Sequence, residues 1–456
     1  MTMHPREGGR KRPFGLGGTP MDRRAFLRTT GLTAASIPLA SAILAACTDP
    51  TKQGKVDESV LNPARPDNPV TLPVNQADMI ADGLKPEAGP LELYNWEDYI
   101  NPRIIGLFEE QYGVKVNRNT FNTEQEALGT LTATDTPYDV YFPSPNVLAR
   151  LASSGLLRPL NKSYLPNLTN TWEVYHGTTP QTPFYDVGAL YTVPYTVYTT
   201  GIGWRIDQPR GSAIAGPGED VIPSMSNPYE ILWDSAYKGK VHILDDYKEA
   251  IGMTLLKNGI YDVNTDDEST RAANLETARA DLIEMVNNVD VKADITDYTD
   301  LPEGASLIHQ GWSGDFVSVQ YYFPDYQVDK DVIRYWAPSE NMMIGNDMMA
   351  VVSSGKNPVL AHHFLNFMLD FDANDNSGNS IVNFQWLGYL PPMAGLNKDD
   401  LIKGRGAWQT GRVVQPSLET CLPTEEDFTK GQILCELTPE IDREWQDVWD
   451  AFKAQG

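Results

Sequence analysis

LELYNWEDYINPRIIGLFEEQYGVKVNRNTF, residues 91–121, decides the fold class of this chain. Its first six residues alternate in the manner of a strand. Residues 102–113 place apolar side chains at helical spacing and end on Gly113, a common helix stop. Residues 114–121 predict the next strand. A strand, a helix and a strand in succession indicate an α/β fold with a mostly parallel sheet.

The alternation of strands and helices continues toward the C-terminus. Further strands are predicted at 138–145, 238–246 and 346–352, and helices at 268–286 and 358–369. A second block opens at 198–207, and RYWAP (334–338) is expected to return the chain through the hinge. At 456 residues the chain is too long for one ordinary core, so we expect two globular lobes with appendages.

The first 46 residues have the three parts of a twin-arginine lipoprotein signal. A basic segment contains DRRAFL (22–27), an apolar stretch follows at 31–46, and LAAC (44–47) forms a lipobox. The apolar stretch carries Thr, Ser and Pro and falls short of the ~20 residues of a membrane-spanning helix. We therefore expect export, acylation of Cys47 and lipid anchoring to the outer, periplasmic face of the cytoplasmic membrane. Translation could start at Met21 instead of Met1.

The segment after the lipobox and the overall charge narrow the choice of partners. Residues 47–88 are rich in Pro, Asp, Asn and Lys, which predicts a lipidated Cys followed by a flexible tether. The chain has 61 acidic and 36 basic residues, a net charge of −25, and no basic patch, so nucleic acid is a poor partner. Such an acidic surface is either simply solvating or serves to concentrate cations.

Two cysteines remain once Cys47 is assigned to the lipobox. Cys421 and Cys435 lie in an exported chain, where a disulfide between them is the favoured interpretation. Two buried free thiols are the alternative.

The motifs of enzymes and metal sites are incomplete in this sequence. GIGWRI (201–206) lacks the final glycine of a dinucleotide fingerprint, and GWSGD (311–315) ends on Asp where a nucleophile elbow needs Gly. Only six histidines are present, and His362 and His363 are adjacent rather than four apart. We therefore predict a protein that is not an enzyme, without cofactor or metal. An exported hydrolase that uses Asp and Glu pairs is the remote alternative.

Aromatic and acidic residues instead gather where predicted strands end. Trp96 and Tyr99 follow the first strand, DDYKE places Asp246 and Glu249 after a later one, and Trp312 and Asp315 follow SLIHQG. In open α/β sheets, the turns beyond the carboxyl ends of strands line the ligand crevice. We expect these side chains to face a ligand.

An ordered series of motifs resembles the periplasmic spermidine/putrescine-binding family of ABC importers, from about residue 91 to the C-terminus. The motifs are LYNWEDYI (93–100), YGVKV (112–116), YDVYFPS (138–144), GLLRPLNKS (155–163), VPY (193–195), TTGIGW (199–204), GWSGD (311–315), FLNFML (364–369) and LGYLPP (387–392).

The resemblance implies an α/β, two-lobed periplasmic-binding-protein clamp, type II-like, with the ligand between the lobes. Lobe 1 would comprise residues 89–200 and about 346–390, and lobe 2 about 201–345 and 391–456. The partners it implies are a polyamine, an ABC permease and the ATPase of that permease. The ligand-binding positions it implies are Trp96, Tyr99, Ser144, Asp246, Glu249, Trp312, Asp315, Asp347 and Tyr389.

One position departs from the family pattern. The family has an aromatic residue two positions before the acid at Asp347, and this chain has Gly345. One wall of the ligand slot would therefore be open or filled from elsewhere.

The chemistry of these residues fits a polyamine independently of the resemblance. Each buried ammonium needs a carboxylate, because an unpaired buried charge is costly. Each buried methylene contributes ~0.8 kcal/mol, and aromatic faces add ~0.5–2 kcal/mol of cation–π attraction. Another organic cation, or a neutral solute such as a sugar, is the alternative ligand, because aromatic rings also stack on sugars.

The lipobox leads to a first prediction. Cys47→Ala removes the acylated side chain, so the protein should leave the membrane fraction or stay unprocessed. Fractionation and mass spectrometry of the N-terminal peptide measure this outcome. Membrane retention and processing identical to wild type would exclude Cys47 as the anchor.

Overall fold

A single mixed sheet forms the centre of the protein. The computed structural model describes residues 64–133, 137–178, 182–403 and 414–455, so Cys47 and the export signal lie outside the described residues. Within them, ten strands follow the order β2-β1-β3-β10-β5-β8-β6-β7, with β4 paired to β10 and β9 paired to β5. The strands are β1 Leu91–Trp96, β2 Val116–Phe121, β3 Val140–Tyr141, β4 Leu157–Arg158, β5 Thr192–Arg205, β6 Val241–Leu244, β7 Lys292–Asp294, β8 Ile308–Trp312, β9 Ile333–Trp336 and β10 Met343–Val352.

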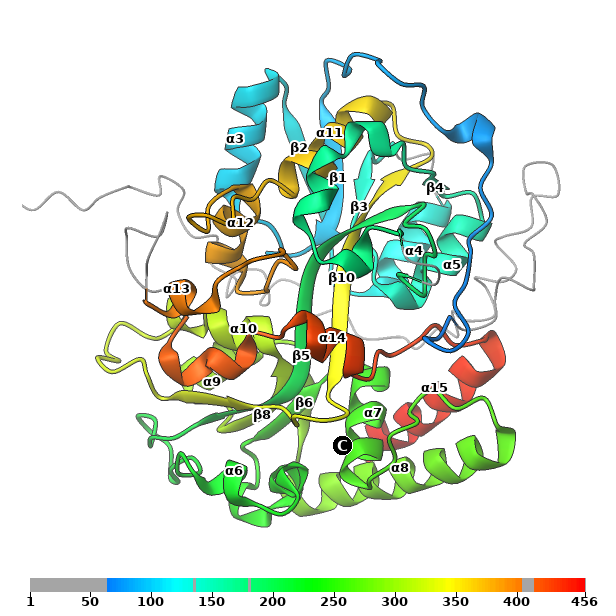
Figure 1. Ribbon diagram of the computed structural model, residues 1–456. Coiled ribbons are helices and arrows are strands. Elements are labelled where there is room, and N and C mark those ends of the chain that lie inside the picture. The colour runs from blue at the N-terminus through cyan, green and yellow to red at the C-terminus, as the bar shows by residue number, and fades with distance from the viewer. Residues whose placement is uncertain (1–63, 134–136, 179–181, 404–413, 456) are drawn as a thin grey trace, which may run out of the picture. The chain divides into compact units, whose positions relative to one another are not determined.

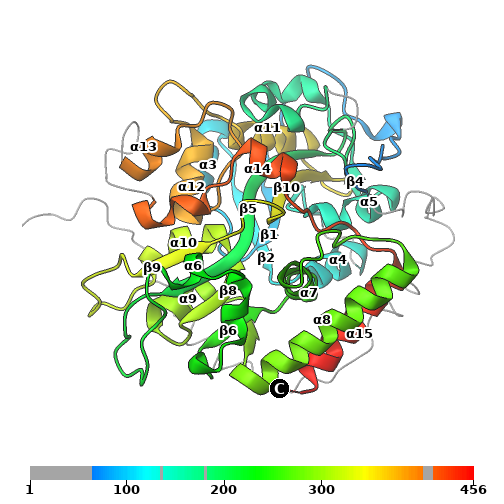
Figure 2. The same ribbon diagram turned by 60° about the horizontal axis from the view of Figure 1, so that its bottom comes forward.

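Helices cover the two ends of the sheet and define two lobes (Figure 1). The first lobe contains β1–β4 with α3, α4, α5, α11 and α12, and the second contains β6–β9 with α6–α10 and α15. In the second lobe, α8 and α15 lie side by side (Figure 2). The helices are α3 Pro102–Tyr112, α4 Glu124–Ala133, α5 Pro145–Ser153, α6 Val221–Ser224, α7 Tyr247–Lys257, α8 Glu268–Val289, α9 Asp297–Glu303, α10 Ser313–Ser318, α11 Pro358–Met368, α12 Asn379–Leu387, α13 Lys398–Lys403, α14 Glu425–Lys430 and α15 Pro439–Lys453.

Local sequence signals account for the first α/β unit. Asn101 caps α3 by accepting a hydrogen bond from the backbone of Arg103, Pro102 occupies the first turn, and Gly113 ends the helix in the left-handed region at φ 67°. The strands β1 and β2 then pair in parallel. This unit forms as the sequence predicts.

Two long strands connect the lobes, and they make the sheet mixed rather than mostly parallel as expected. β5 and β10 run antiparallel to each other from one lobe to the other (Figure 1). Parallel pairing is confined to the two ends of the sheet, β2-β1-β3 and β8-β6-β7. The central pair is antiparallel because the chain crosses into the second lobe along β5 and returns along β10.

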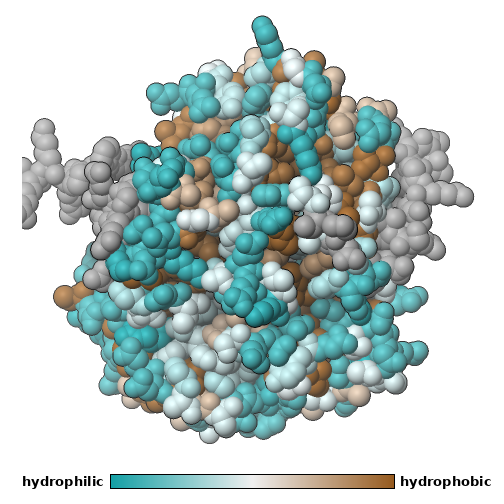
Figure 3. Space-filling view, in the orientation of Figure 1, coloured by the Kyte–Doolittle hydropathy of each residue, from teal (hydrophilic) through white to brown (hydrophobic). Residues whose placement is uncertain are grey.

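The hydrophobic cores follow this arrangement. One core lies within the second lobe around Trp204 and Leu282, and another lies within the first around Tyr141 and Leu148. The largest core extends from Leu91 in the first lobe to Phe316 in the second. Because this core is continuous, the lobes are packed against each other. Hydrophilic side chains cover most of the face seen in Figure 3.

The segment expected to be a tether packs against the body from residue 64 onward. Leu72 is buried in the core of the first lobe. The Glu87 carboxylate accepts hydrogen bonds from the backbone of Val359 (3.3 Å) and Leu360 (2.8 Å) in the first turn of α11. Arg65 donates to the backbone carbonyl of Asn264 in the second lobe. Residues 64–88 are therefore part of the folded protein. The expectation of a flexible tether over residues 47–88 is wrong for this second part of the segment.

The two cysteines are free thiols, contrary to the favoured disulfide interpretation. Cys421 ends a short 3-10 helix and is buried in the largest core. Cys435 donates to the carbonyl of Ile433, and its own backbone N–H donates to the side chain of Asn264. Each thiol has its own enclosed position, and burial raises the pKa of both.

In the described part of the chain, no helix combines the length and apolar character needed to cross a membrane.

A buried carboxylate in the first lobe provides a test of the fold. Asp139 is fully buried and accepts hydrogen bonds from the backbone N–H of Glu92 (2.8 Å) and from the backbone and side chain of Asn357 (2.8 and 2.9 Å). Asp139→Ala leaves these donors buried without a partner, so the free energy of unfolding should fall by at least ~2 kcal/mol. Urea titration measures the loss, with exposed Glu110→Ala as the control within ~0.5 kcal/mol. If the free energy of unfolding fell no more than in the control, the hydrogen bonds of Asp139 would not stabilise the first lobe.

Candidate ligand-binding site

Three of the predicted acids are each held by the polar group of a predicted aromatic residue. The pairs are the Tyr99 hydroxyl donating to Asp347 Oδ2 (2.6 Å), the Tyr389 hydroxyl donating to Asp315 Oδ2 (2.8 Å) and Trp312 Nε1 donating to Glu249 Oε1 (3.0 Å). The six residues come from both lobes and from the central strand β10. The structure therefore brings together residues that are as much as 290 positions apart in the sequence.

The aromatic rings of these pairs form a continuous run between the lobes. The ring of Tyr389 lies edge-on to Tyr99 at 5.1 Å and to Tyr198 at 5.7 Å, and Tyr198 lies 6.1 Å from Trp312. Tyr198, in the middle of β5, was not predicted from the sequence. It supplies the ring that links the two ends of the run.

Tyr198 also answers the question raised by Gly345. The two residues face each other across the β5–β10 ladder. A side chain at position 345 would begin 2.6 Å from ring atoms of Tyr198, closer than real side chains approach. The wall expected from an aromatic residue on β10 is therefore filled by Tyr198 on β5.

The other predicted residues lie at the edges of this arrangement. Asp246 caps α7 by accepting from the backbone of Lys248 (2.9 Å) and Glu249 (3.2 Å). The Ser144 hydroxyl donates to Asn146 Oδ1 at 2.8 Å and lies 3.3 Å from a carboxylate of Glu124. Trp96 packs on Phe121 at 4.5 Å, and its buried Nε1 has no hydrogen-bond partner among the described residues.

Sequence reasoning missed two further acids next to the predicted ones. Glu124 begins α4, directly after β2, and accepts from the Tyr141 hydroxyl at 2.9 Å. Its position beyond the carboxyl end of a strand was the available signal. Asp297 is fully buried at the start of α9, and no side chain among the described residues donates a hydrogen bond to its carboxylate. The charge of Asp315 adds to burial in raising the pKa of Asp297 well above its ordinary value.

The electrostatics of the site favour the protonated form of its acids. Burial raises the pKa of Asp347 to about 7 and that of Glu249 to about 7. Burial raises the pKa of Glu124 to about 8, and the charge of Asp347 adds to this shift. Lys248 lowers the pKa of Glu124 and Asp246, but burial outweighs it at both. The site is therefore a group of carboxyls with too little positive charge nearby.

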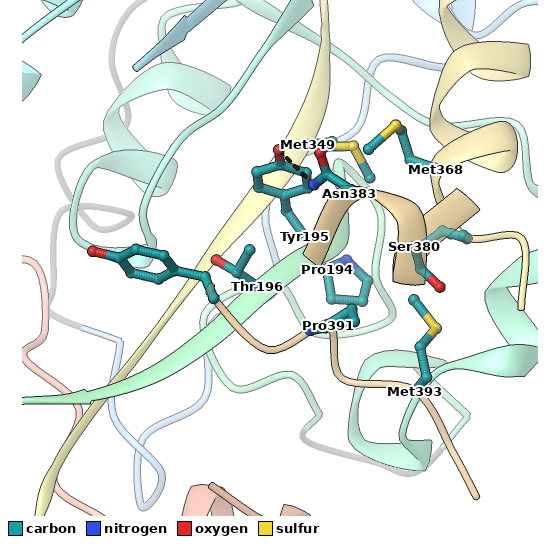
Figure 4. Close-up of a pocket in the computed structure, with 11 residues that line it drawn as sticks. Pro194, Tyr195, Thr196, Met349, Met368, Ser380, Asn383, Pro391 and Met393 are labelled. Atoms are coloured by element: carbon teal, nitrogen blue, oxygen red, sulfur yellow. Dashed lines mark hydrogen bonds between the residues drawn. The ribbon is translucent and has the colours of Figure 1, made fainter. Parts of the chain in front are cut away.

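A small pocket lies next to this group but differs from it in chemistry. Figure 4 shows Pro194, Tyr195, Met349, Met368 and other uncharged side chains around it, with Asn383 donating to the Tyr195 hydroxyl at 2.9 Å. None of its lining residues carries a charge. Without a carboxylate, this pocket offers nothing to pair with a cation, so the candidate site is the acidic group rather than the pocket.

Solved structures with a similar fold include substrate-binding proteins of ABC transporters. The spermidine/putrescine ABC transporter substrate-binding protein of Streptococcus pneumoniae superposes with a TM-score of 0.60 at 21% identity, covering 80% of this chain and 98% of that protein. A lipoprotein of Treponema pallidum gives a TM-score of 0.59 at 20% identity, covering 79% and 98%. At these identities the similarity establishes the fold.

The sequence itself identifies the family. The profile described as bacterial extracellular solute-binding protein matches residues 104–409, and the chain belongs to that family. Among its relatives are the putrescine-binding periplasmic protein of Escherichia coli, 27% identical over 296 residues (63% of this chain, 75% of the relative). The spermidine/putrescine-binding periplasmic protein of the same organism is 28% identical over 281 residues (61% and 72%).

The raised pKa values predict how pH acts on the ligand-free protein. Between the ordinary pKa of a carboxyl, about 4, and the value of about 7 at Asp347, the folded state holds a proton that the unfolded state has released. The free energy of unfolding should therefore fall as pH rises through this window, by up to ~1.4 kcal/mol per pH unit for this group.

Asp347→Asn removes this contribution, so the pH dependence of its unfolding should be flatter than that of wild type between pH 5 and 7. Urea titrations at several pH values measure the two slopes. Exposed Asp450→Asn serves as the control and should retain the wild-type slope. Equal slopes in wild type and Asp347→Asn would show that Asp347 ionises freely in the folded protein.

Proposed function

We propose that this protein binds a polyamine between its lobes and delivers it to a membrane permease of an ABC importer. The observation that carries the proposal is a group of carboxyls held in place by neighbouring side chains, of which Asp347 and Glu249 are buried without enough positive charge nearby to neutralise them. The names of the Escherichia coli relatives, which bind putrescine or spermidine, support the same substrate class.

The arrangement suits a flexible chain that carries separated ammonium groups. Asp347 lies next to the first lobe, and Glu249 and Asp315 belong to the second, so an extended diamine could meet a carboxylate at each end. The rings of Tyr99, Tyr389, Tyr198 and Trp312 offer the intervening methylenes an apolar surface. Glu124 joins the nine sequence-predicted positions as a further proposed partner of an ammonium group.

Cation binding would also make closure of the two lobes depend on ligand. In a closed arrangement, acids from both lobes would lie close together, and their mutual repulsion would oppose closure unless a cation lay between them. A ligand that contacts both lobes shifts the population toward the closed form. Polyamine binding would then signal to the permease through closure, with lobe boundaries near residues 200, 346 and 390.

We also propose that the protein acts at the cell surface. A twin-arginine signal and lipidated Cys47 would hold the protein to the outer face of the cytoplasmic membrane, next to the permease and its ATPase. The family to which the chain belongs is extracellular, which is consistent with this location. The protein would act as a receptor without enzymatic activity.

A thermal-shift panel tests the ligand class. Putrescine, spermidine and spermine should raise the melting temperature, and amino acids and sugars should not, because only the polyamines supply separated positive charges. A ligand at one hundred times its Kd adds ~2.7 kcal/mol to the free energy of unfolding. Choline carries a single positive charge, so comparing it with the polyamines shows whether one cationic group is enough for binding. Stabilisation by a sugar and not by any polyamine would replace the proposal with its neutral-solute alternative.

Calorimetry with Asp347→Asn assigns the binding to the site. This substitution keeps the shape and removes the charge, so polyamine binding should weaken by ~2–5 kcal/mol, the range for truncating a buried charge pair. Wild type should also release protons on binding near pH 7, because a bound ammonium lowers the raised pKa of Asp347. Exposed Asp450→Asn should bind as wild type does. Unchanged affinity in a folded Asp347→Asn protein would remove Asp347 from the site.

A further inference from the structure

A second group of ionisable side chains lies in the second lobe, apart from the three aromatic–carboxylate pairs. It consists of His242 on β6, Asp294 at the end of β7, Asp300 in α9 and His309 on β8. One ligand atom from each residue can be chosen so that all four lie within 4.8 Å of one another. The strands β6, β7 and β8 are neighbours in the sheet, and α9 lies beside them (Figure 2).

The register of the sheet places these residues together. His242 and His309 are direct partners on the parallel strands β6 and β8, so their rings project from the same face, 5.3 Å apart. Asp294 lies two residues beyond Lys292, the partner of His242 on β7, and so projects from that face as well. The sequence showed no metal motif because these residues come from four separate elements and not from one local pattern.

The ring nitrogens and carboxylates converge closely without forming a complete hydrogen-bond network. His242 Nδ1 lies 2.9 Å from Asp294 Oδ2 and 3.2 Å from Asp300 Oδ2. Both atoms of the shorter contact, His242 Nδ1 and Asp294 Oδ2, are buried, and the contact does not have standard hydrogen-bond geometry. His242 is only 5% exposed. The ligand atoms of the four residues therefore surround a common space.

The surroundings of His309 favour a cation in that space. His309 Nδ1 lies 2.6 Å from the backbone carbonyl of Gln310, which can only accept, so Nδ1 carries a proton. In the neutral ring, Nε2 then directs a lone pair at Asp294 Oδ1, 3.1 Å away. Two acceptors do not bond to each other unless a proton or a metal ion lies between them. Histidines that bind metals commonly donate their other N–H to a backbone carbonyl in this way.

A neighbouring residue forms hydrogen bonds with both carboxylates, as is usual for carboxylates that bind a metal ion. The backbone N–H of Thr296 donates to Asp294 Oδ1 at 3.1 Å. The Thr296 hydroxyl lies 3.0 Å from that oxygen and 3.0 Å from Asp300 Oδ2. Thr296 therefore orients both acids at once, a role that outer-shell residues play in metal sites.

We propose that His242, Asp294, Asp300 and His309 bind one divalent transition-metal ion of the Zn²⁺ type. Two neutral imidazoles and two carboxylates form a four-ligand nitrogen and oxygen set that suits tetrahedral Zn²⁺ and balances its charge. Ca²⁺ and Mg²⁺ prefer sites built from oxygen alone. The ion would join β6, β7, β8 and α9 and so stabilise the second lobe.

The competing explanation is a network of protonated histidines and acids without metal. Lys292 lies 3.0 Å from Asp294 Oδ2 and 3.5 Å from Asp300 Oδ2 and contributes a positive charge to either arrangement. Its side chain is 58% exposed, so the ammonium can turn into water when a metal ion binds. The two explanations differ in whether the purified protein takes up one metal ion.

Metal binding to the chelator-treated protein, purified without a histidine tag, decides between them. Zn²⁺ titration by calorimetry, with metal content measured after gel filtration, should give one Zn²⁺ per chain and a higher melting temperature. His309→Ala and Asp300→Asn should each weaken Zn²⁺ binding at least ~100-fold, and Thr296→Val should weaken it ~10–100-fold. His363→Ala, a half-buried histidine in the other lobe, is the matched control and should bind Zn²⁺ as wild type does.

Three outcomes would overturn the proposal. They are no stoichiometric Zn²⁺ in wild type, unchanged Zn²⁺ affinity in Asp300→Asn, and equal or tighter binding of Ca²⁺. Asp300→Asn preserves the size and shape of the side chain, so it gives a clear answer even if His309→Ala fails to fold. Polyamine is left out of every titration, so the result is independent of the proposed ligand.

Discussion

The constraint on which this structure depends is the burial of several carboxyls in one place with too few positive charges to balance them. Water stabilises an ionised carboxylate by solvation, whereas the interior of the protein does so poorly. The fold compensates in part because Tyr99, Trp312 and Tyr389 donate hydrogen bonds to Asp347, Glu249 and Asp315 respectively. Because too little positive charge remains near these carboxyls, a cationic ligand bound among them would gain a favourable electrostatic interaction.

The same constraint explains why the aromatic residues are tyrosine and tryptophan. A phenylalanine offers the same apolar face but has no donor for a carboxylate. In each pair, one side chain orients the acid and also provides ring surface. The acids are thereby fixed in position before any ligand arrives, which reduces the entropy lost on binding.

Sequence reasoning succeeded where the signal was local and failed where it depended on register. The helix after β1 was predicted because Pro102 and Gly113 mark its ends within the chain itself. Tyr198 was missed because its place above Gly345 follows from the pairing of β5 with β10, which no local pattern reveals.

The cysteines also show that sequence reasoning fails where the outcome depends on the three-dimensional position of residues, whereas three of the predicted acids do lie beside predicted aromatic residues. A disulfide was inferred from count and compartment, but Cys421 and Cys435 occupy separate buried positions that the sequence does not disclose. The three aromatic–acid pairs did come together from the predicted positions. Trp312 and Glu249 meet because they follow the neighbouring strands β8 and β6. Asp347 was expected at the mouth of its strand but lies inside β10, so its position, like that of Tyr389, was available only from the family resemblance. The role of the three pairs in binding stays a prediction until it is measured.

The register of the β5–β10 ladder shifts between Asp347 and Met348, because Tyr195 on β5 has no partner on β10. A bulge bends its strand and sharpens the local twist, and this one lies in a strand that both lobes share. Asp347 therefore lies beside a bend in the one pair of strands that both lobes share. Any change in the bonding of Asp347 therefore reaches the backbone that joins the lobes directly, without passing through intervening side chains.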